Sequence, residues 1–143
     1  MSFKKVQLQD YQFKTNLDDP RIFSKLVNWS DQADFILTGY PDDEGIKLNG
    51  GRIGAALAPH EVRKAFYKMT AGFLPPSSIF DAGNISTDIP LAQRHLVAEN
   101  AAEDFYTAGK FVMTVGGGHD YGYPDTQAFL NAHKARVLFV RFE

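Results

Sequence analysis

The chain has 143 residues, a hydrophobic fraction of 44% and a formal net charge of −2, which together exclude a disordered chain and favour one globular domain. Its Lys and Arg residues are scattered, so the sequence offers no basic face for nucleic acid or an anionic membrane. Cysteine is absent, which excludes disulfides and thiolate metal sites. With no apolar signal region and no apolar run of membrane-spanning length, the cytoplasm is the expected location.

Caps and apolar periodicity predict the elements of the first half of the chain. A helix is predicted over residues 18–29, with Asp19 as its N-cap and Pro20 at its first position. A strand follows over residues 33–41, and then a long, polar, glycine-rich loop over residues 42–58. A second helix is predicted over residues 59–70. The apolar faces of the two helices would be formed by Ile22, Phe23, Leu26 and Val27 in the first and Val62, Ala65, Phe66 and Met69 in the second.

The second half alternates strands and helices. A strand is predicted over residues 77–86, and the longest helix over residues 88–110, from an Asp88 cap and Pro90 to a stop at Gly109. The expected buried stripe of this helix consists of Ala98, Ala101, Ala102 and Phe105. The remaining elements are a strand over residues 111–115, a helix over residues 125–134 and a strand over residues 136–142.

Unbroken apolar strands that alternate with helices predict a parallel sheet covered on both faces, an α/β fold of three layers. In such sheets the ligand site lies outside the carboxyl ends of the strands. Polar side chains gather there in this sequence: Asp42, Asp43 and Glu44 after the first predicted strand, Asp81 in the second, and His119 and Asp120 after the third. The chemistry of the protein is therefore expected at this edge.

The stretch Gly116–Gly117–Gly118–His119–Asp120 is the strongest local signal. It lacks the Lys-Ser/Thr of a phosphate-binding loop and the glycine spacing of a dinucleotide site, so close backbone approach around a ligating His119 is the better interpretation. Asp120 would either orient the neighbouring imidazole or the turn, or contact metal. The other histidines and the first acidic pair are interpreted more plainly. His60, His95 and His133 are expected to be ordinary helical residues, and Asp42 and Asp43 a solvated turn.

Two motifs in the expected order resemble those of a known family. Residues 39–66, beginning GYPDDEGIKLNGGRIGA, look like the first loop and helix of the ureohydrolases, the group of arginase, agmatinase and formimidoylglutamase. GGGHD at residues 116–120 looks like the first metal motif of that family. DEGIKLNGGRIGA is most similar to the formimidoylglutamase branch. The resemblance covers roughly residues 33–143 and implies that the chain is the N-terminal part of a single arginase-type αβα domain, spanning residues 1–143.

The resemblance implies a binuclear manganese centre with His119 as one ligand. Further carboxylates and a histidine would come from an Asp-Ala-His-x-Asp motif after the fourth strand and a later Asp-x-Asp motif. The printed sequence stops where the first of these should begin, with Glu143 at or near the slot of its first Asp. One imidazole falls well short of the ligand set that Mn²⁺ needs, so the chain is expected to be truncated and inactive alone, with uncovered strand edges.

The implied chemistry is hydrolysis of a C–N bond in a small guanidino or formimino substrate by water that two manganese ions activate. Asn49 and Arg52 are candidates for substrate contact, or else brace the loop; Arg52 could pair with a substrate carboxylate. A homo-oligomer is compatible with the sequence. Two alternatives stay open at this point: a non-catalytic remnant or interaction module, and a small-ligand-binding α/β module that uses the glycine-rich turn as an anion nest.

Overall fold

The computed structural model of the chain describes residues 3–11, 13, 18–71 and 78–134. Four strands form one sheet in the order β1-β3-β2-β4. β2 runs parallel to both β3 and β4, whereas β1 is antiparallel to β3. The parallel pairing of the three predicted strands is thus confirmed, and the strand predicted over residues 136–142 lies outside the described residues. The bounds are β1 Phe3–Lys4, β2 Phe35–Tyr40, β3 Ile79–Ile85 and β4 Phe111–Gly116.

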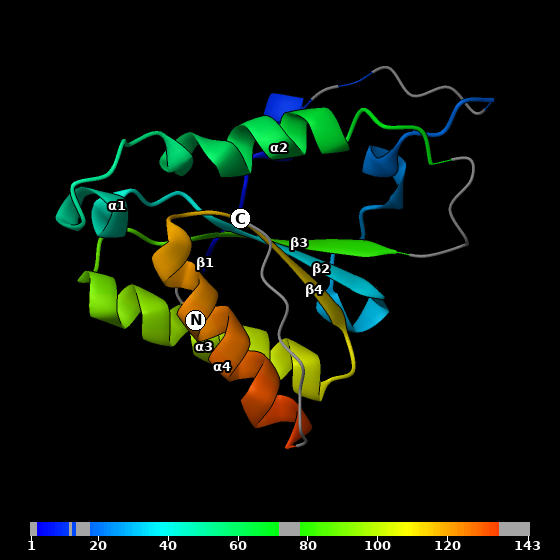
Figure 1. Cartoon of the computed structure of the whole chain (residues 1–143). Helices are drawn as coiled ribbons and strands as arrows, with labels where there is room; N and C mark the ends of the chain where they lie inside the picture. Colours follow the sequence, from blue (N-terminus) through cyan, green and yellow to red (C-terminus); the bar gives the residue numbers. More distant parts are fainter. Residues whose placement is uncertain (1–2, 12, 14–17, 72–77, 135–143) are drawn as a thin grey trace.

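Helices cover both faces of this sheet. Figure 1 shows α2 on one face, and α3 and α4 packed against each other on the opposite face. The predicted three-layer α/β fold is therefore confirmed for the described part of the chain. Within those residues, no helix combines the length and the apolarity that crossing a bilayer requires. The bounds are α1 Glu44–Leu48, α2 Ala58–Phe66, α3 Leu91–Thr107 and α4 Gly122–His133.

The helix predicted over residues 18–29 is wrong. The structure has only a short 3₁₀ turn at Ile22–Lys25 in this region. The backbone amide of Ile22 donates to the carbonyl of Met69 at 2.9 Å, and that of Val27 donates to the carbonyl of Ile79 at 2.8 Å. Because these amides bond to other segments, they cannot bond within a helix, so tertiary pairing overrides the local signal.

The core lies on both faces of the sheet. On the face of α2, a buried cluster joins two N-terminal residues, Tyr11 and Ile22, to the sheet and α2. Its other members are Leu37, Tyr67, Ala71 and Ile79. On the other face, the buried cluster consists of Tyr40, Ile85, Ala98 and Tyr121. The alanine stripe predicted for α3 is confirmed at Ala98, Ala101 and Ala102. Small side chains on this stripe let the helix lie close to its neighbours.

The buried face of α2 differs from the predicted apolar one. Val62 is 42% exposed, whereas Arg63 is fully buried; Met69, predicted as part of the same face, lies beyond the end of α2 and is 56% exposed. The Arg63 guanidinium forms a two-pronged ion pair with Asp81 in β3, at 2.7 Å from Nε and 2.8 Å from Nη2. Its other bonds go to Asn84 and to backbone carbonyls. A buried arginine is tolerated because its N–H groups are paired, and it fastens α2 to β3.

Candidate functional site

Two loops meet at the carboxyl ends of β2 and β4. The first runs from Tyr40 into α1, and the second is the glycine-rich turn that leads from β4 through His119–Tyr121 into α4. Tyr40 pairs with Gly116 as the last register position of the two parallel strands. The loops therefore leave the sheet side by side, and the expectation that polar residues gather at this edge is confirmed for these two segments.

A pocket of about 310 Å³ lies between the two loops. The structure thus brings Asn49 together with His119 and Asp120, although about 70 residues separate them in the chain. Arg52 is exposed next to this lining but not part of it, and Glu143 lies outside the described residues. His119 and Asn49 are both exposed, so their side chains are open to a ligand. The lining residues are Gly45, Ile46, Asn49, Gly51, His119 and Asp120.

The glycines before His119 are required by the route of the backbone. Gly116 has φ +88° and Gly117 has φ +76°, a left-handed region that side chains rarely adopt. A Cβ at Gly116 would also lie 2.9 Å from the carbonyl oxygen of Tyr40 and closer still to the Pro59 ring. The turn can therefore pass tightly over the end of β2 and place His119 at the pocket.

Asp42 is not the solvated turn residue that the sequence suggested. It is 4% exposed and accepts three hydrogen bonds: from the Tyr121 hydroxyl at 2.6 Å, from Arg94 Nη1 at 2.9 Å and from the Glu44 amide at 2.9 Å. Burial alone would raise the pKa of Asp42, but the bonds from Tyr121, the Glu44 amide and Arg94 together lower it below its usual value. Asp42 therefore ties the loop after β2 to α3 and to the turn after β4.

Asp43 fits the expected turn role more closely. It is half-buried and accepts the backbone amides of Gly54 and Ala56, each at 3.0 Å. These bonds fold the glycine-rich loop back on itself, beside the short helix α1 that the sequence did not predict. Asp43 thus shapes the loop that carries Asn49.

Arg94 is a buried charge beside the site that the sequence did not reveal. Its guanidinium, with a side chain only 10% exposed, pairs with Asp42 at 2.9 Å and with Glu44 at 2.7 Å. It also donates to two carbonyls just before α3, those of Thr87 and Ile89. An arginine in an otherwise amphipathic helix carries no signal of burial, because solvent exposure is the usual state of the residue.

His95 also differs from the ordinary helical residue expected. Its Nε2 lies 2.7 Å from Oδ2 of Asp120, and both side chains are about three-quarters buried. Its ring stands edge-on to Tyr121, with centroids 4.8 Å apart. The other two helical histidines make contacts away from the pocket: His60 bonds to the Tyr11 hydroxyl and His133 to the carbonyl of Phe129.

The donor set of the described residues fits only part of a manganese site. Mn²⁺ takes several oxygen and imidazole ligands, yet no group of three or more His, Asp or Glu side chains lies within reach of one ion in the described ranges. His119 offers one exposed imidazole, and the Asp120 carboxylate beside it is bonded to His95. Asp81, expected at this edge, instead binds Arg63 on the face of α2.

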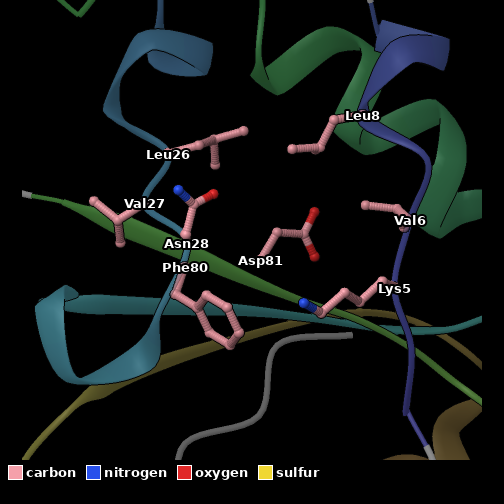
Figure 2. A pocket seen from close by; sticks show the side chains of 8 residues that line it. All are labelled: Lys5, Val6, Leu8, Leu26, Val27, Asn28, Phe80 and Asp81. Carbon is pink, nitrogen blue, oxygen red and sulfur yellow. The ribbon is translucent and has the colours of Figure 1, made fainter.

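A second, smaller hollow of about 80 Å³ lies between the N-terminal segment and β3. Figure 2 shows its lining, in which Lys5, Asn28 and Asp81 are the polar groups and the apolar side chains are those of Val6, Leu8, Leu26, Val27 and Phe80. The Asp81 carboxylate is held by Arg63, by the Tyr67 hydroxyl and by the amide of Gly83. Since that carboxylate is already fully engaged, the pocket at the ends of β2 and β4 is the better candidate site.

Comparison with known proteins places this geometry in a family. The chain is 37% identical over 103 residues to a formimidoylglutamase of Staphylococcus carnosus, covering 68% of this chain and 31% of that protein. It is 34% identical over 107 residues to a formimidoylglutamase of Rhodococcus jostii, covering 71% and 33%. The chain thus spans about a third of the length of these curated relatives.

Solved structures agree with the sequence matches. A formiminoglutamase from Trypanosoma cruzi with Mn²⁺ superposes with a TM-score of 0.75 at 31% identity, over 81% of this chain and 41% of that one. An arginase superfamily protein from the same organism gives a TM-score of 0.76 at the same identity and coverage. The sequence profile of the arginase family matches residues 33–143, which include both loops of the pocket and the glycine-rich turn. The chain belongs to the arginase family.

Proposed function

We propose that this chain supplies part of the active site of a manganese-dependent hydrolase that cleaves a C–N bond in a formimino or guanidino compound, of the formimidoylglutamase type. The observation that carries the proposal is the shared pocket: His119 on the turn after β4 faces the same space as Asn49 and Gly51 on the loop after β2. The formimidoylglutamase relatives and the Mn²⁺ in the Trypanosoma cruzi structures support it.

His119 is the proposed manganese ligand of this chain. Its imidazole is exposed at the pocket, on a turn whose glycines bring the backbone close to the end of β2. A neutral imidazole is a common metal ligand near pH 7. When bound, manganese would act as a Lewis acid that lowers the pKa of water and so provides a nucleophile near neutrality. Asp120, beside it, is proposed to orient the site rather than to coordinate.

Asn49 and Arg52 are proposed to contact the substrate. The Asn49 amide lines the pocket and offers both a donor and an acceptor to a planar formimino or guanidino group. Arg52 is exposed one residue beyond Gly51 of the lining, so its guanidinium is open to a forked pairing with a substrate carboxylate. Asp43 supports both side chains indirectly, because the hydrogen bonds that it accepts from two backbone amides fold the loop that carries them.

The wider setting is proposed from the same resemblance. Residues 1–143 would form the N-terminal part of one ureohydrolase-like domain, with Glu143 in or near the first ligand position of a second metal motif. The proposal places the protein in the cytoplasm, with a small molecule rather than nucleic acid or a membrane as its partner, and it is compatible with a homo-oligomer.

The test is activity and metal content together. The 143-residue chain alone should release no formamide, ammonia or urea from formiminoglutamate, arginine, agmatine or guanidinobutyrate in the presence of Mn²⁺, because one imidazole cannot hold two ions. Joined to the remainder of the Staphylococcus carnosus relative, it should become active. In that fusion, His119→Ala should lower manganese from two ions toward one per chain, while His133→Ala should leave it unchanged.

Two results would contradict this proposal. If His119→Ala kept both ions and Asp43→Asn lost one, the loop after β2 would be the metal-binding element. Turnover by the 143-residue chain alone that depended on Mn²⁺ and disappeared in His119→Ala would refute the claim that the site is only partial.

A further inference from the structure

We propose that His95, on α3, is a positioning residue for the pocket: it holds the Asp120 carboxylate in a slot between α1 and the glycine-rich turn, and thereby fixes the turn that presents His119. The inference rests on the proposed function, because the site that His95 would position is the one proposed for manganese. It assigns a role to a residue that does not itself line the pocket but bonds to Asp120, which does.

The slot around Asp120 has three walls. His95 Nε2 lies 2.7 Å from Oδ2 of the carboxylate. A methyl group added at Gly45, in α1, would lie 2.5 Å from the carboxyl carbon of Asp120. One added at Gly118 would lie 2.3 Å from its Oδ1. Since real Cβ atoms do not approach other atoms so closely, the carboxylate occupies space that only glycines leave open, and it is held there by a histidine from a third element.

Contacts with three other elements hold the two residues that follow His119, which are Asp120 and Tyr121. Tyr121 stacks on Tyr40 with ring centroids 4.4 Å apart, and its hydroxyl donates to the buried Asp42. The His95 ring stands at 86° to the Tyr121 ring, so one side chain of α3 contacts both Asp120 and Tyr121. His119 itself is exposed, so the position of its backbone depends on the contacts of Asp120 and Tyr121, which follow it.

Two substitutions, His95→Ala and Gly45→Ala, perturb this slot from different elements. His95→Ala removes the hydrogen bond from α3, whereas His95→Gln retains an N–H group that can reach the same carboxylate oxygen. Gly45→Ala pushes the carboxylate from the side of α1, although alanine is the better helix former and should not weaken α1 itself. The matched controls are His133→Ala, far from the pocket on α4, and Gly122→Ala, where an added methyl group meets nothing within 4 Å.

The experiment follows the histidine ring signals of the whole chain by NMR during a titration with Mn²⁺. Paramagnetic Mn²⁺ broadens nuclei near its binding site even when binding is weak, so one ligating imidazole is enough for a readout. Changes in groups that orient metal ligands cost about 10 to 100-fold in affinity. We expect His95→Ala and Gly45→Ala to need about 10-fold more Mn²⁺ to broaden His119. His95→Gln and both controls should match the unchanged chain.

The unfolding midpoint of each variant is measured in parallel with EDTA present. This measurement separates an effect on metal binding from an effect on folding. The inference predicts that Gly45→Ala still unfolds cooperatively and stays folded at the temperature of the titration, so that its weaker Mn²⁺ response comes from a folded chain. Equal Mn²⁺ responses at His119 in the parent, His95→Ala and Gly45→Ala would overturn the role of His95 and leave His119 as a ligand. If Mn²⁺ did not broaden the His119 signals in the parent chain, His119 would not be a manganese ligand. The positioning role of His95 would then be refuted as well.

Discussion

Replacing Asp42 with asparagine should cost the chain about 3 kcal/mol of folding free energy. The carboxylate is 4% exposed and receives hydrogen bonds from Tyr121, Arg94 and the Glu44 amide. Removing one partner of a buried ion pair typically costs about 3–5 kcal/mol, since the other charge stays buried. The lower figure applies because Arg94 keeps Glu44 at 2.7 Å and the asparagine oxygen can still accept a bond.

The assay is urea unfolding of the chain, with thermal unfolding as a second probe. A loss of about 3 kcal/mol corresponds to a fall of about 10 °C in the midpoint for a chain of this size. Because the pKa of Asp42 is lowered in the folded state, its stabilisation is present above the ordinary carboxyl pKa of about 3.9 and is lost as the pH falls through the folded value. The difference in unfolding free energy between the parent and Asp42→Asn should therefore become smaller below about pH 4.

Asp104→Asn, an exposed substitution on α3, is the control for the change of charge. It should stay within about 0.5 kcal/mol of the parent. If Asp42→Asn also stayed within that margin at pH 7, the reasoning that this carboxylate joins three elements would be refuted.

Two further predictions concern other buried charges. Arg63→Met should cost about 3–5 kcal/mol by urea unfolding, because it leaves Asp81 buried without its guanidinium; a cost below about 1 kcal/mol would show that the pair does not fasten α2 to β3. Asp125 accepts bonds from the hydroxyls of Tyr40 and Thr114, each at 2.7 Å, and burial raises its pKa. Stability of the parent should therefore fall relative to Asp125→Asn as the pH rises from about 4 through the folded pKa, and a constant difference across pH 4–7 would contradict this.

The sequence predicted those parts of the fold that depend on local apolar patterns. The three strands and the helices over α2, α3 and α4 were confirmed because continuous apolar runs and capping residues are local signals. The helix over residues 18–29 failed because Ile22 and Val27 bond to Met69 and Ile79, about 50 residues away. No local pattern encodes such partners, and the two-residue strand β1 is too short to leave one.

The site was predictable only in part, and for a related reason. His119 and the loop with Asn49 line one pocket, as the strand-end rule requires. Asp42, Arg63 and Arg94 are charged residues whose type predicts exposure, so nothing in the sequence marked them as buried. The bond between His95 and Asp120 joins residues 25 positions apart on different elements, and only the packing of α3 beside the turn brings them together.

The antiparallel strand β1 has a consequence for the order in which the chain assembles. Phe3 pairs with Ile85, and Lys4 forms an ion pair with Asp88, 84 positions along the chain. Closing so long a loop costs about 4 kcal/mol of chain entropy, and the two residues of β1 recover little of it unless β3 is already in place. During synthesis from the N-terminus, β1 therefore stays unpaired until the ribosome has made β3 and the residues that follow it.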